Sequence, residues 1–241
     1  MAEKLLEVRQ VTKRFGGFRA LSNISLHVNE HERLGLIGPN GSGKTTLINC
    51  ISGSLRNESG SILFSGTDIG AMPTYQRARL GIARSFQIPK PFVSMTLLEN
   101  LCIPLEYAAH LKPRDGGVVT EAMEILDQIG LADRADARPA DLTQINMRKL
   151  ELARAIAAKP RLLISDEAMA GLSAAEVDGI LEILFKLNQQ GITIIMIEHI
   201  MRAVMSFSER IVVLDAGEKI AEGTPDEILT DKAVERAYLG E

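Results

Sequence analysis

The sequence predicts an α/β fold in which helices cover both faces of a mostly parallel sheet, and three observations support this. Short apolar runs alternate with helix-like segments along most of the chain. These runs, residues 33–37, 82–86, 162–165, 193–197 and 211–214, are hydrophobic on both faces, as strands of a covered parallel sheet are. A glycine-rich turn, residues 38–43, joins the first run to a helix-like segment at 45–54.

The remaining elements differ in pattern from these core strands. Roughly the first 30 residues, and residues 61–64, alternate in polarity as antiparallel edge strands do. Between residues 89 and 142 the strand signal disappears, and 96–109 and 120–129 are expected to be helices of an inserted arm. Near the end, Thr224 as cap, Pro225 at the first helical position and Glu227 at the third predict a short terminal helix.

Composition narrows the class of protein. The chain has 241 residues, of which 46% are hydrophobic and 24% charged, as in an ordinary folded protein. Its net charge of −4 gives no reason to expect a nucleic-acid partner. No apolar run approaches the roughly 20 residues that a membrane-spanning helix needs, and the first ten residues contain no apolar signal core. The two cysteines, Cys50 and Cys102, have no metal-type spacing, so buried reduced thiols in a cytoplasmic protein are expected.

The run GPNGSGKTT, residues 38–46, meets the phosphate-binding pattern G-x-x-x-x-G-K-[ST] at every fixed position. Gly38, Gly41 and Gly43 allow the curved backbone that presents N–H groups to a triphosphate. Lys44 supplies a positive charge for the terminal phosphates, and the Thr45 hydroxyl is suited to ligate Mg²⁺. The alternative, a glycine-rich turn with an incidental lysine, fits less well between a strand and a helix. The candidate nucleotide-binding residues are Gly38, Pro39, Asn40, Gly41, Ser42, Gly43, Lys44, Thr45 and Thr46.

Polar side chains follow three further apolar runs, where ligands of α/β sheets usually bind. Asp166 is suited to hold Mg²⁺ through water, and Glu167 to orient or deprotonate the attacking water. Gln87 is expected to contact that water and the metal, and His199 the γ-phosphate. Each of these residues alone is more often a solvated or structural side chain. Together with the phosphate loop they predict a nucleotide hydrolysis site, with Thr45, Gln87 and Asp166 as its Mg²⁺ ligands.

The order and spacing of GPNGSGKTT, Gln87, LLISDE and His199 resemble those of the ATP-binding subunits of ABC transporters, and the resemblance covers the whole chain. Within that family the chain looks most like the subunits of importers for branched-chain amino acids and of their hydrophobic or amide relatives. The segments that carry this closer likeness are RSFQ at 84–87, MAGL at 169–172, IEHIMRAVM at 197–205 and RAYLGE at 236–241.

The resemblance implies an α/β fold: a P-loop NTPase (RecA-like) core with an antiparallel β subdomain and a helical insertion subdomain. Residues 1–241 would form a single ABC ATPase domain. Residues 1–88 and 150–221 would be the nucleotide-binding core with the β subdomain, 89–149 the helical subdomain and 222–241 a C-terminal helix. By the same likeness the bound cofactors are ATP and Mg²⁺, and Phe15 stacks on adenine. The alternative for Phe15 is a core phenylalanine.

Partners follow from the same resemblance. It implies a second ABC ATPase subunit, identical or paralogous, two transmembrane permease subunits and, indirectly, an extracytoplasmic solute-binding protein. The helical arm and the segment after Gln87 would dock on the membrane partner. This places the chain peripherally on the inner face of the cell membrane.

The chain departs from the family in its signature motif, which normally reads LSGGQ, or LTYGQ in this subgroup, and faces a γ-phosphate held by the other subunit. Ile145 replaces the second glycine, and its branched side chain is expected to obstruct backbone approach to a phosphate. Thr143 still offers a hydroxyl. The positions that match the motif are Leu142, Thr143, Gln144, Ile145 and Asn146.

We interpret the chain as an ATPase subunit that drives uptake of a small solute, branched-chain or related amino acids by the resemblance. A nucleotide-binding regulatory subunit with weak hydrolysis of its own is the alternative, which Ile145 favours and the Asp166, Glu167 and His199 set disfavours. A soluble ABC ATPase of translation or DNA repair is expected to have tandem cassettes or coiled coils, which this sequence lacks. A phosphate-loop kinase has no need of Gln87 and His199.

Overall fold

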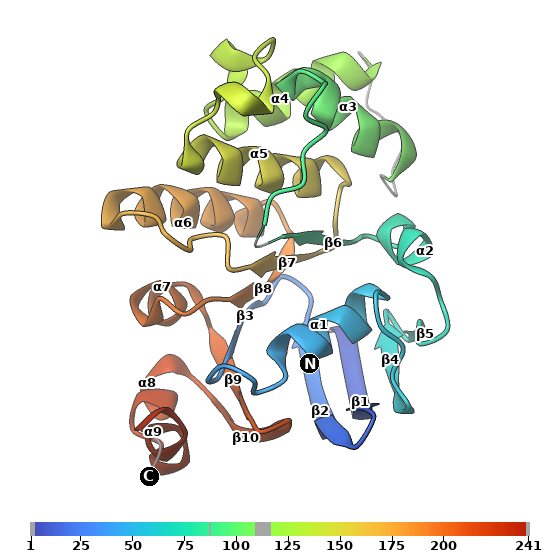
Figure 1. Ribbon diagram of the computed structural model, residues 1–241, viewed down its shortest axis with the longest axis vertical. Coiled ribbons are helices and arrows are strands. Elements are labelled where there is room, and N and C mark those ends of the chain that lie inside the picture. The colour runs from blue at the N-terminus through green and yellow to red at the C-terminus, as the bar shows by residue number, and fades with distance from the viewer. Residues whose placement is uncertain (1–2, 87, 109–116, 240–241) are drawn as a thin grey trace.

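The computed structural model describes residues 3–86, 88–108 and 117–239, and its strands form two sheets with helices around them (Figure 1). The smaller sheet is antiparallel and has the order β2-β1-β4-β5. Its strands are β1 Lys4–Phe15, β2 Phe18–Asn29, β4 Ser59–Phe64 and β5 Thr67–Asp68. The edge strands predicted near the N-terminus and at 61–64 are thus confirmed.

The larger sheet has the order β10-β9-β3-β8-β7-β6. Its strands are β3 Arg33–Ile37, β6 Ile82–Ser85, β7 Leu162–Asp166, β8 Thr193–Ile197, β9 Arg210–Asp215 and β10 Glu218–Gly223. The five strands predicted from apolar runs are all present and pair in parallel. The sequence did not predict β10, an antiparallel edge strand whose residues are exposed or half-buried.

The helices are α1 Lys44–Ser52, α2 Thr74–Arg79, α3 Leu97–Tyr107, α4 Gly117–Gln128, α5 Gln144–Ala157, α6 Ala174–Gln189, α7 Met201–Phe207, α8 Pro225–Leu229 and α9 Lys232–Leu239. Both helices predicted in the arm are present, and Figure 1 shows α3, α4 and α5 together at the top. The predicted border between residues 149 and 150 falls inside α5, so the division into subdomains stays a prediction. Within the described residues, no helix has the length and apolar character needed to cross a membrane.

Two apolar clusters pack on the larger sheet. The helical-side cluster contains the buried apolar residues of α3 to α7, and the sheet-side cluster contains those of α1 and the smaller sheet. Alternate residues of one strand enter different clusters: Leu163 of β7 joins the helical-side cluster, while Leu162 and Ile164 join the sheet-side cluster. This arrangement explains why the strands are hydrophobic on both faces.

Helix α1 ends at Ser52, two residues earlier than the sequence predicted. Gly53 follows it in a left-handed conformation, with φ at 87°. The buried guanidinium of Arg77 donates to the last carbonyls of the helix, those of Cys50 at 2.6 Å and Ile51 at 2.8 Å. A cation at this position is favourable because the C-terminal end of a helix carries partial negative charge.

The C-terminal region holds two helices where the sequence predicted one. The predicted cap of α8 is confirmed: Thr224 N–H donates to Glu227 Oε2 at 2.7 Å, and the Thr224 hydroxyl accepts from the Glu227 N–H. The helix stops at Leu229 because Asp231 caps a new one, its Oδ1 accepting from the Ala233 N–H at 2.7 Å. Helix α9 follows.

Candidate functional site at the carboxyl edge of the larger sheet

The phosphate loop connects β3 to α1, and its backbone leaves room for glycine alone at two positions. A Cβ atom on Gly38, whose φ is 148°, would lie 2.0 Å from the Leu214 carbonyl oxygen. A Cβ on Gly43, whose φ is 104°, would lie 2.7 Å from the Ala20 carbonyl oxygen. The neighbouring strands therefore fix the curvature of the loop, which glycine alone tolerates.

Lys44 is buried inside that curve. Its Nζ donates to the Gly38 carbonyl at 2.7 Å and to the Pro39 carbonyl at 3.0 Å. Burial lowers the pKa of Lys44, and the negative charges of Glu167 and Asp166 act in the opposite direction. The lysine thus lies between the loop and the two carboxylates, where it is positioned to attract an anion.

The first turn of α1 completes the anion-binding geometry. Its cap, Gly43, is left-handed and offers no side-chain acceptor, so the first amides of the helix are open to a ligand. Thr45 is exposed and Thr46 is half-buried on this turn. The other loop residues range from the exposed Asn40 and Gly41 at the tip to the half-buried Pro39 and the buried Ser42.

Asp166, at the end of β7, is buried and ion-paired with an arginine that the sequence analysis did not single out. Its Oδ2 accepts from Arg84 Nη2 at 2.5 Å. Arg84, on β6, also donates through Nη1 to Asn49 Oδ1 at 2.6 Å. In the sequence, Arg84 is the first residue of the RSFQ segment and a charged residue inside an otherwise apolar run, but neither signal assigned it a role.

Glu167 and His199 meet across the ends of β7 and β8, with His199 Nε2 at 2.8 Å from Glu167 Oε1. Glu167 has a φ of 48°, and its N–H donates to the Ile197 carbonyl at 2.9 Å. This contact and the position of Lys44 confirm that three of the predicted strand ends converge on one edge. Gln87, predicted on the fourth, lies outside the described residues.

Glu198, the residue that follows β8, is a buried acidic residue to which the sequence analysis assigned no role. It is 2% exposed, and its Oε1 accepts from the Met169 N–H at 2.8 Å. Burial raises the pKa of Glu198 to about 7, helped by the negative charge of Glu167. Through this hydrogen bond, Glu198 connects the end of β8 to Met169 in the loop that follows Glu167.

Replacing Glu198 with glutamine is expected to stabilise the protein in a pH-dependent way. Because its pKa is higher in the folded chain than in the unfolded one, the group favours folding fully below pH 4.5 and loses this contribution as pH rises through about 7. Glutamine keeps an oxygen for the Met169 N–H and cannot ionise. The free energy of unfolding should rise by on the order of 2–3 kcal/mol at pH 8, and less at pH 5.

Urea unfolding at both pH values measures this difference. Glu182→Gln, a change at an exposed glutamate of α6, is the matched control and should give no pH-dependent gain. An equal gain at both pH values for Glu198→Gln would show that ionisation of Glu198 does not limit stability.

Phe15 ends β1 and is 49% exposed, which excludes the alternative of a core phenylalanine. Lys13 Nζ lies 5.4 Å from the centroid of its ring. The exposed ring is available to a flat partner such as a base, and the stacking role stays a prediction.

The degenerate signature begins α5. Thr143 caps the helix, and its hydroxyl accepts from the Asn146 N–H at 3.5 Å. Exposed Gln144 places its Nε2 at 3.4 Å from the Ala170 carbonyl. The Ile145 side chain is half-buried against the helical-side cluster, so the obstruction we expect comes from its Cβ and from the loss of glycine. That effect stays a prediction.

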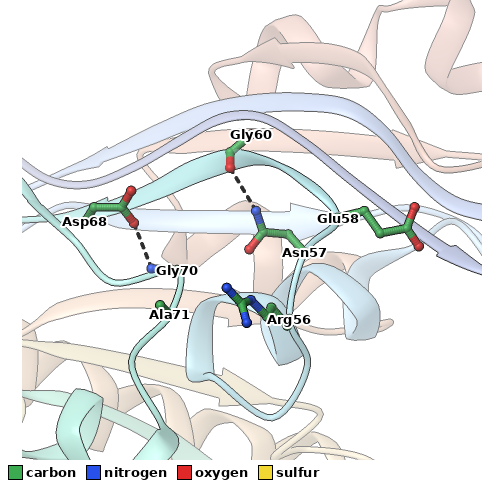
Figure 2. Close-up of a pocket in the computed structure, with 7 residues that line it drawn as sticks. All are labelled: Arg56, Asn57, Glu58, Gly60, Asp68, Gly70 and Ala71. Atoms are coloured by element: carbon green, nitrogen blue, oxygen red, sulfur yellow. Dashed lines mark hydrogen bonds between the residues drawn. The ribbon is translucent and has the colours of Figure 1, made fainter.

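A separate hollow lies beside the smaller sheet, and none of the candidate site residues lines it (Figure 2). It measures about 310 Å³ and is lined by Arg56, Asn57, Glu58, Gly60, Asp68, Gly70 and Ala71. Several of its polar groups bond to one another: Asp68 accepts from the Gly70 N–H at 2.8 Å, and the Asn57 amide donates to the Gly60 carbonyl at 2.9 Å. We therefore place the candidate site at the sheet edge.

Comparison with known proteins identifies the family. The sequence profile of the ABC transporter family matches residues 21–170. The chain belongs to the ABC transporter ATP-binding cassettes. A second profile, that of the branched-chain amino acid ATP-binding cassette transporters, matches residues 218–241 of the cassette.

Individual relatives agree over nearly the whole cassette. The high-affinity branched-chain amino acid transport ATP-binding protein LivG of Salmonella typhimurium is 38% identical, with 100% of both chains covered. An ABC transporter cassette solved in its ADP conformation is 33% identical, with a TM-score of 0.88 over 99% of each chain. A dimeric cassette bound to ADP and Pi is 26% identical, with a TM-score of 0.82 over 91% of this chain and 98% of that one.

Family membership settles the coarse chemistry. This cassette is a nucleotide-binding ATPase with a P-loop NTPase fold.

Proposed function

We propose that this cassette hydrolyses ATP to drive an importer of branched-chain or related amino acids. The observation that carries the chemistry is the contact of Glu167 with His199 at the same edge as Lys44 and Asp166. The profile match at residues 218–241 and the likeness to LivG support the solute class.

Mg²⁺ fits the donors present at this edge. The Asp166 carboxylate and the Thr45 hydroxyl are oxygen donors of the kind Mg²⁺ prefers. Among the described residues no group of three or more His, Cys, Asp or Glu side chains is placed to hold a metal. A site with few protein ligands is compatible with Mg²⁺, which usually retains several bound water molecules and is also coordinated by phosphate oxygens of the nucleotide. When bound, Mg²⁺ would neutralise phosphate charge, and Gln87 is proposed as a further ligand.

We assign nucleotide binding and proton transfer to side chains and amides of the cassette itself. Lys44 and the first amides of α1 would bind the β- and γ-phosphates, and the Phe15 ring would stack on adenine. The Glu167 carboxylate would accept the proton of the attacking water, and His199, whose Nε2 lies 2.8 Å from Glu167 Oε1, would hold that carboxylate in place. When nucleotide is bound, His199 would instead contact the γ-phosphate.

A second cassette would complete the site, as the dimeric relative bound to ADP and Pi suggests. The segment of Thr143, Gln144, Ile145 and Asn146 would then face the nucleotide held by the partner. The complex would contain two permease subunits, and one of them would dock on this cassette in a groove of about 250 Å³ between α2, α3 and α5, where Phe86 is 42% exposed. An extracytoplasmic binding protein would deliver the solute, and the cassette would lie on the inner face of the membrane.

Uptake in the host organism tests the proposed function. Deleting the gene is expected to reduce uptake of labelled leucine, isoleucine or valine, and the wild-type gene should restore it while a Lys44→Ala copy should not. Unchanged uptake of all three, with loss of uptake of a chemically different solute, would refute the proposed solute class.

The altered signature predicts that the isolated chain is a poor ATPase. A pair of identical subunits would place Ile145 at both composite sites, and its Cβ hinders the approach of backbone N–H groups to the γ-phosphate. Ile145→Gly is expected to raise the turnover of the isolated chain by about tenfold or more. Steady-state ATPase assays measure this.

The complex with a paralogous partner completes that test. There the partner's signature completes the Lys44 and Glu167 site, so replacing the second glycine of that signature should stop most of the hydrolysis. Two results would show that isoleucine is tolerated at position 145. One is rapid ATP turnover by the isolated chain, and the other is unchanged turnover of the complex after the partner's signature glycine is replaced.

A further inference from the structure

Arg84 joins two elements of the site that the phosphate loop does not itself connect. Its guanidinium binds Asp166 Oδ2 at 2.5 Å and Asn49 Oδ1 at 2.6 Å. The side chain is 11% exposed and that of Asp166 7% exposed, so the pair is largely shielded from water. Asp166 ends β7, and Asn49 lies in α1.

Asn49 lies one helical turn after Thr45, on the same face of α1. The arginine therefore ties the strand that presents the carboxylate to the helix that presents the hydroxyl. Arg84 engages Oδ2, and no hydrogen bond or ion pair within the described residues engages Oδ1, so we assign Oδ1 to the Mg²⁺ side of the carboxylate. A planar guanidinium presents its donors in a fixed fork and so imposes this geometry, whereas an ammonium presents all its donors from one rotating nitrogen at the end of a flexible chain.

We propose that Arg84 is a positioning residue that holds the Asp166 carboxylate and the Thr45 helix in the arrangement that Mg²⁺ requires. The proposal rests on the Mg²⁺-dependent ATP binding proposed above. It predicts that loss of Arg84 weakens the response to Mg²⁺ and leaves metal-free nucleotide binding intact.

The test uses the isolated full chain and a fluorescent ATP analogue, titrated with MgCl₂ and, separately, bound in EDTA. Arg84→Met should raise the Mg²⁺ concentration at half-maximal response by about tenfold and change the affinity in EDTA less than about twofold. Arg84→Lys, which keeps the charge, should fall between wild type and Arg84→Met. Circular dichroism melting reports whether each variant is folded.

Arg154→Met is the matched control. Arg154 is also a largely buried arginine of the groove, paired with Glu151 at 3.0 Å and 4.9 Å from the Phe92 centroid, and none of its contacts within the described part of the chain is to Asp166. It should leave the Mg²⁺ midpoint unchanged. An equal shift in this control would show a general loss of packing and overturn the proposal.

An unchanged or lower Mg²⁺ midpoint in folded Arg84→Met would also overturn it. If that variant does not fold, Asn49→Ala removes the contact with the helix and keeps the ion pair, and it should shift the midpoint in the same direction by about threefold; no shift would refute the proposal. A wild-type chain that binds nucleotide without any response to Mg²⁺ would instead refute the proposed metal site.

Discussion

Replacing Glu167 with glutamine is expected to lower ATP turnover by about a hundredfold or more while ATP binding is retained. Glutamine keeps the shape and the oxygen of the side chain, and so the 2.8 Å contact with His199, but an amide is too weak a base to take a proton from water. Steady-state ATPase assays of the assembled complex measure the loss. Gel filtration with ATP should show subunits that stay closed around the unhydrolysed nucleotide.

Glu182→Gln provides the control, because it makes the same chemical change on the exposed face of α6. Its turnover should equal that of the wild type. A Glu167→Gln variant that hydrolyses ATP at a normal rate would assign the base to another group.

Replacing Lys44 with alanine should also lower turnover by orders of magnitude, through loss of phosphate binding. Lys44 is the one cation of the loop at residues 38–46, and it is held within hydrogen-bonding distance of the Gly38 and Pro39 carbonyls. Lys44→Arg should not restore the activity, because the larger guanidinium does not fit a buried position between these carbonyls.

Nucleotide titration and ATPase assays together separate binding from turnover for Lys44→Ala. Lys186→Ala removes an exposed lysine of α6 and should change neither. Wild-type turnover by Lys44→Ala would refute the assignment of the phosphate loop.

The sequence predicted the parallel strands well because each is apolar on both faces. Leu162, Leu163 and Ile164 pack alternately into the two clusters, so all three positions are apolar and the strand is recognisable as an uninterrupted apolar run. Strand β10 escaped prediction for the opposite reason: its residues, from Glu218 to Gly223, are exposed or half-buried at an edge and form no apolar run. The early end of α1 coincides with left-handed Gly53, and its last carbonyls are bound by Arg77, which is distant in the sequence.

The same contrast holds for the site. Lys44, Glu167 and His199 were found together because each follows a parallel strand, and parallel strands end at a common edge. Arg84 and Glu198 were not assigned to the site, because the sequence does not show whether a charged side chain is buried or which groups it binds. Their partners, Asp166 and the Met169 N–H, come from elements brought near only by folding.

The larger sheet has a consequence for how the cassette responds to heat. Each of its central strands contributes side chains to both apolar clusters, so opening either cluster exposes one face of the strands on which the other cluster is also built, and we expect the two to unfold together. The inserted helices and the smaller sheet consequently share a single cooperative unit, however far apart they lie in Figure 1. A cassette that moves its helical arm during a transport cycle must therefore do so by shifting intact packing across the sheet, since partial melting of one side would cost the stability of the whole.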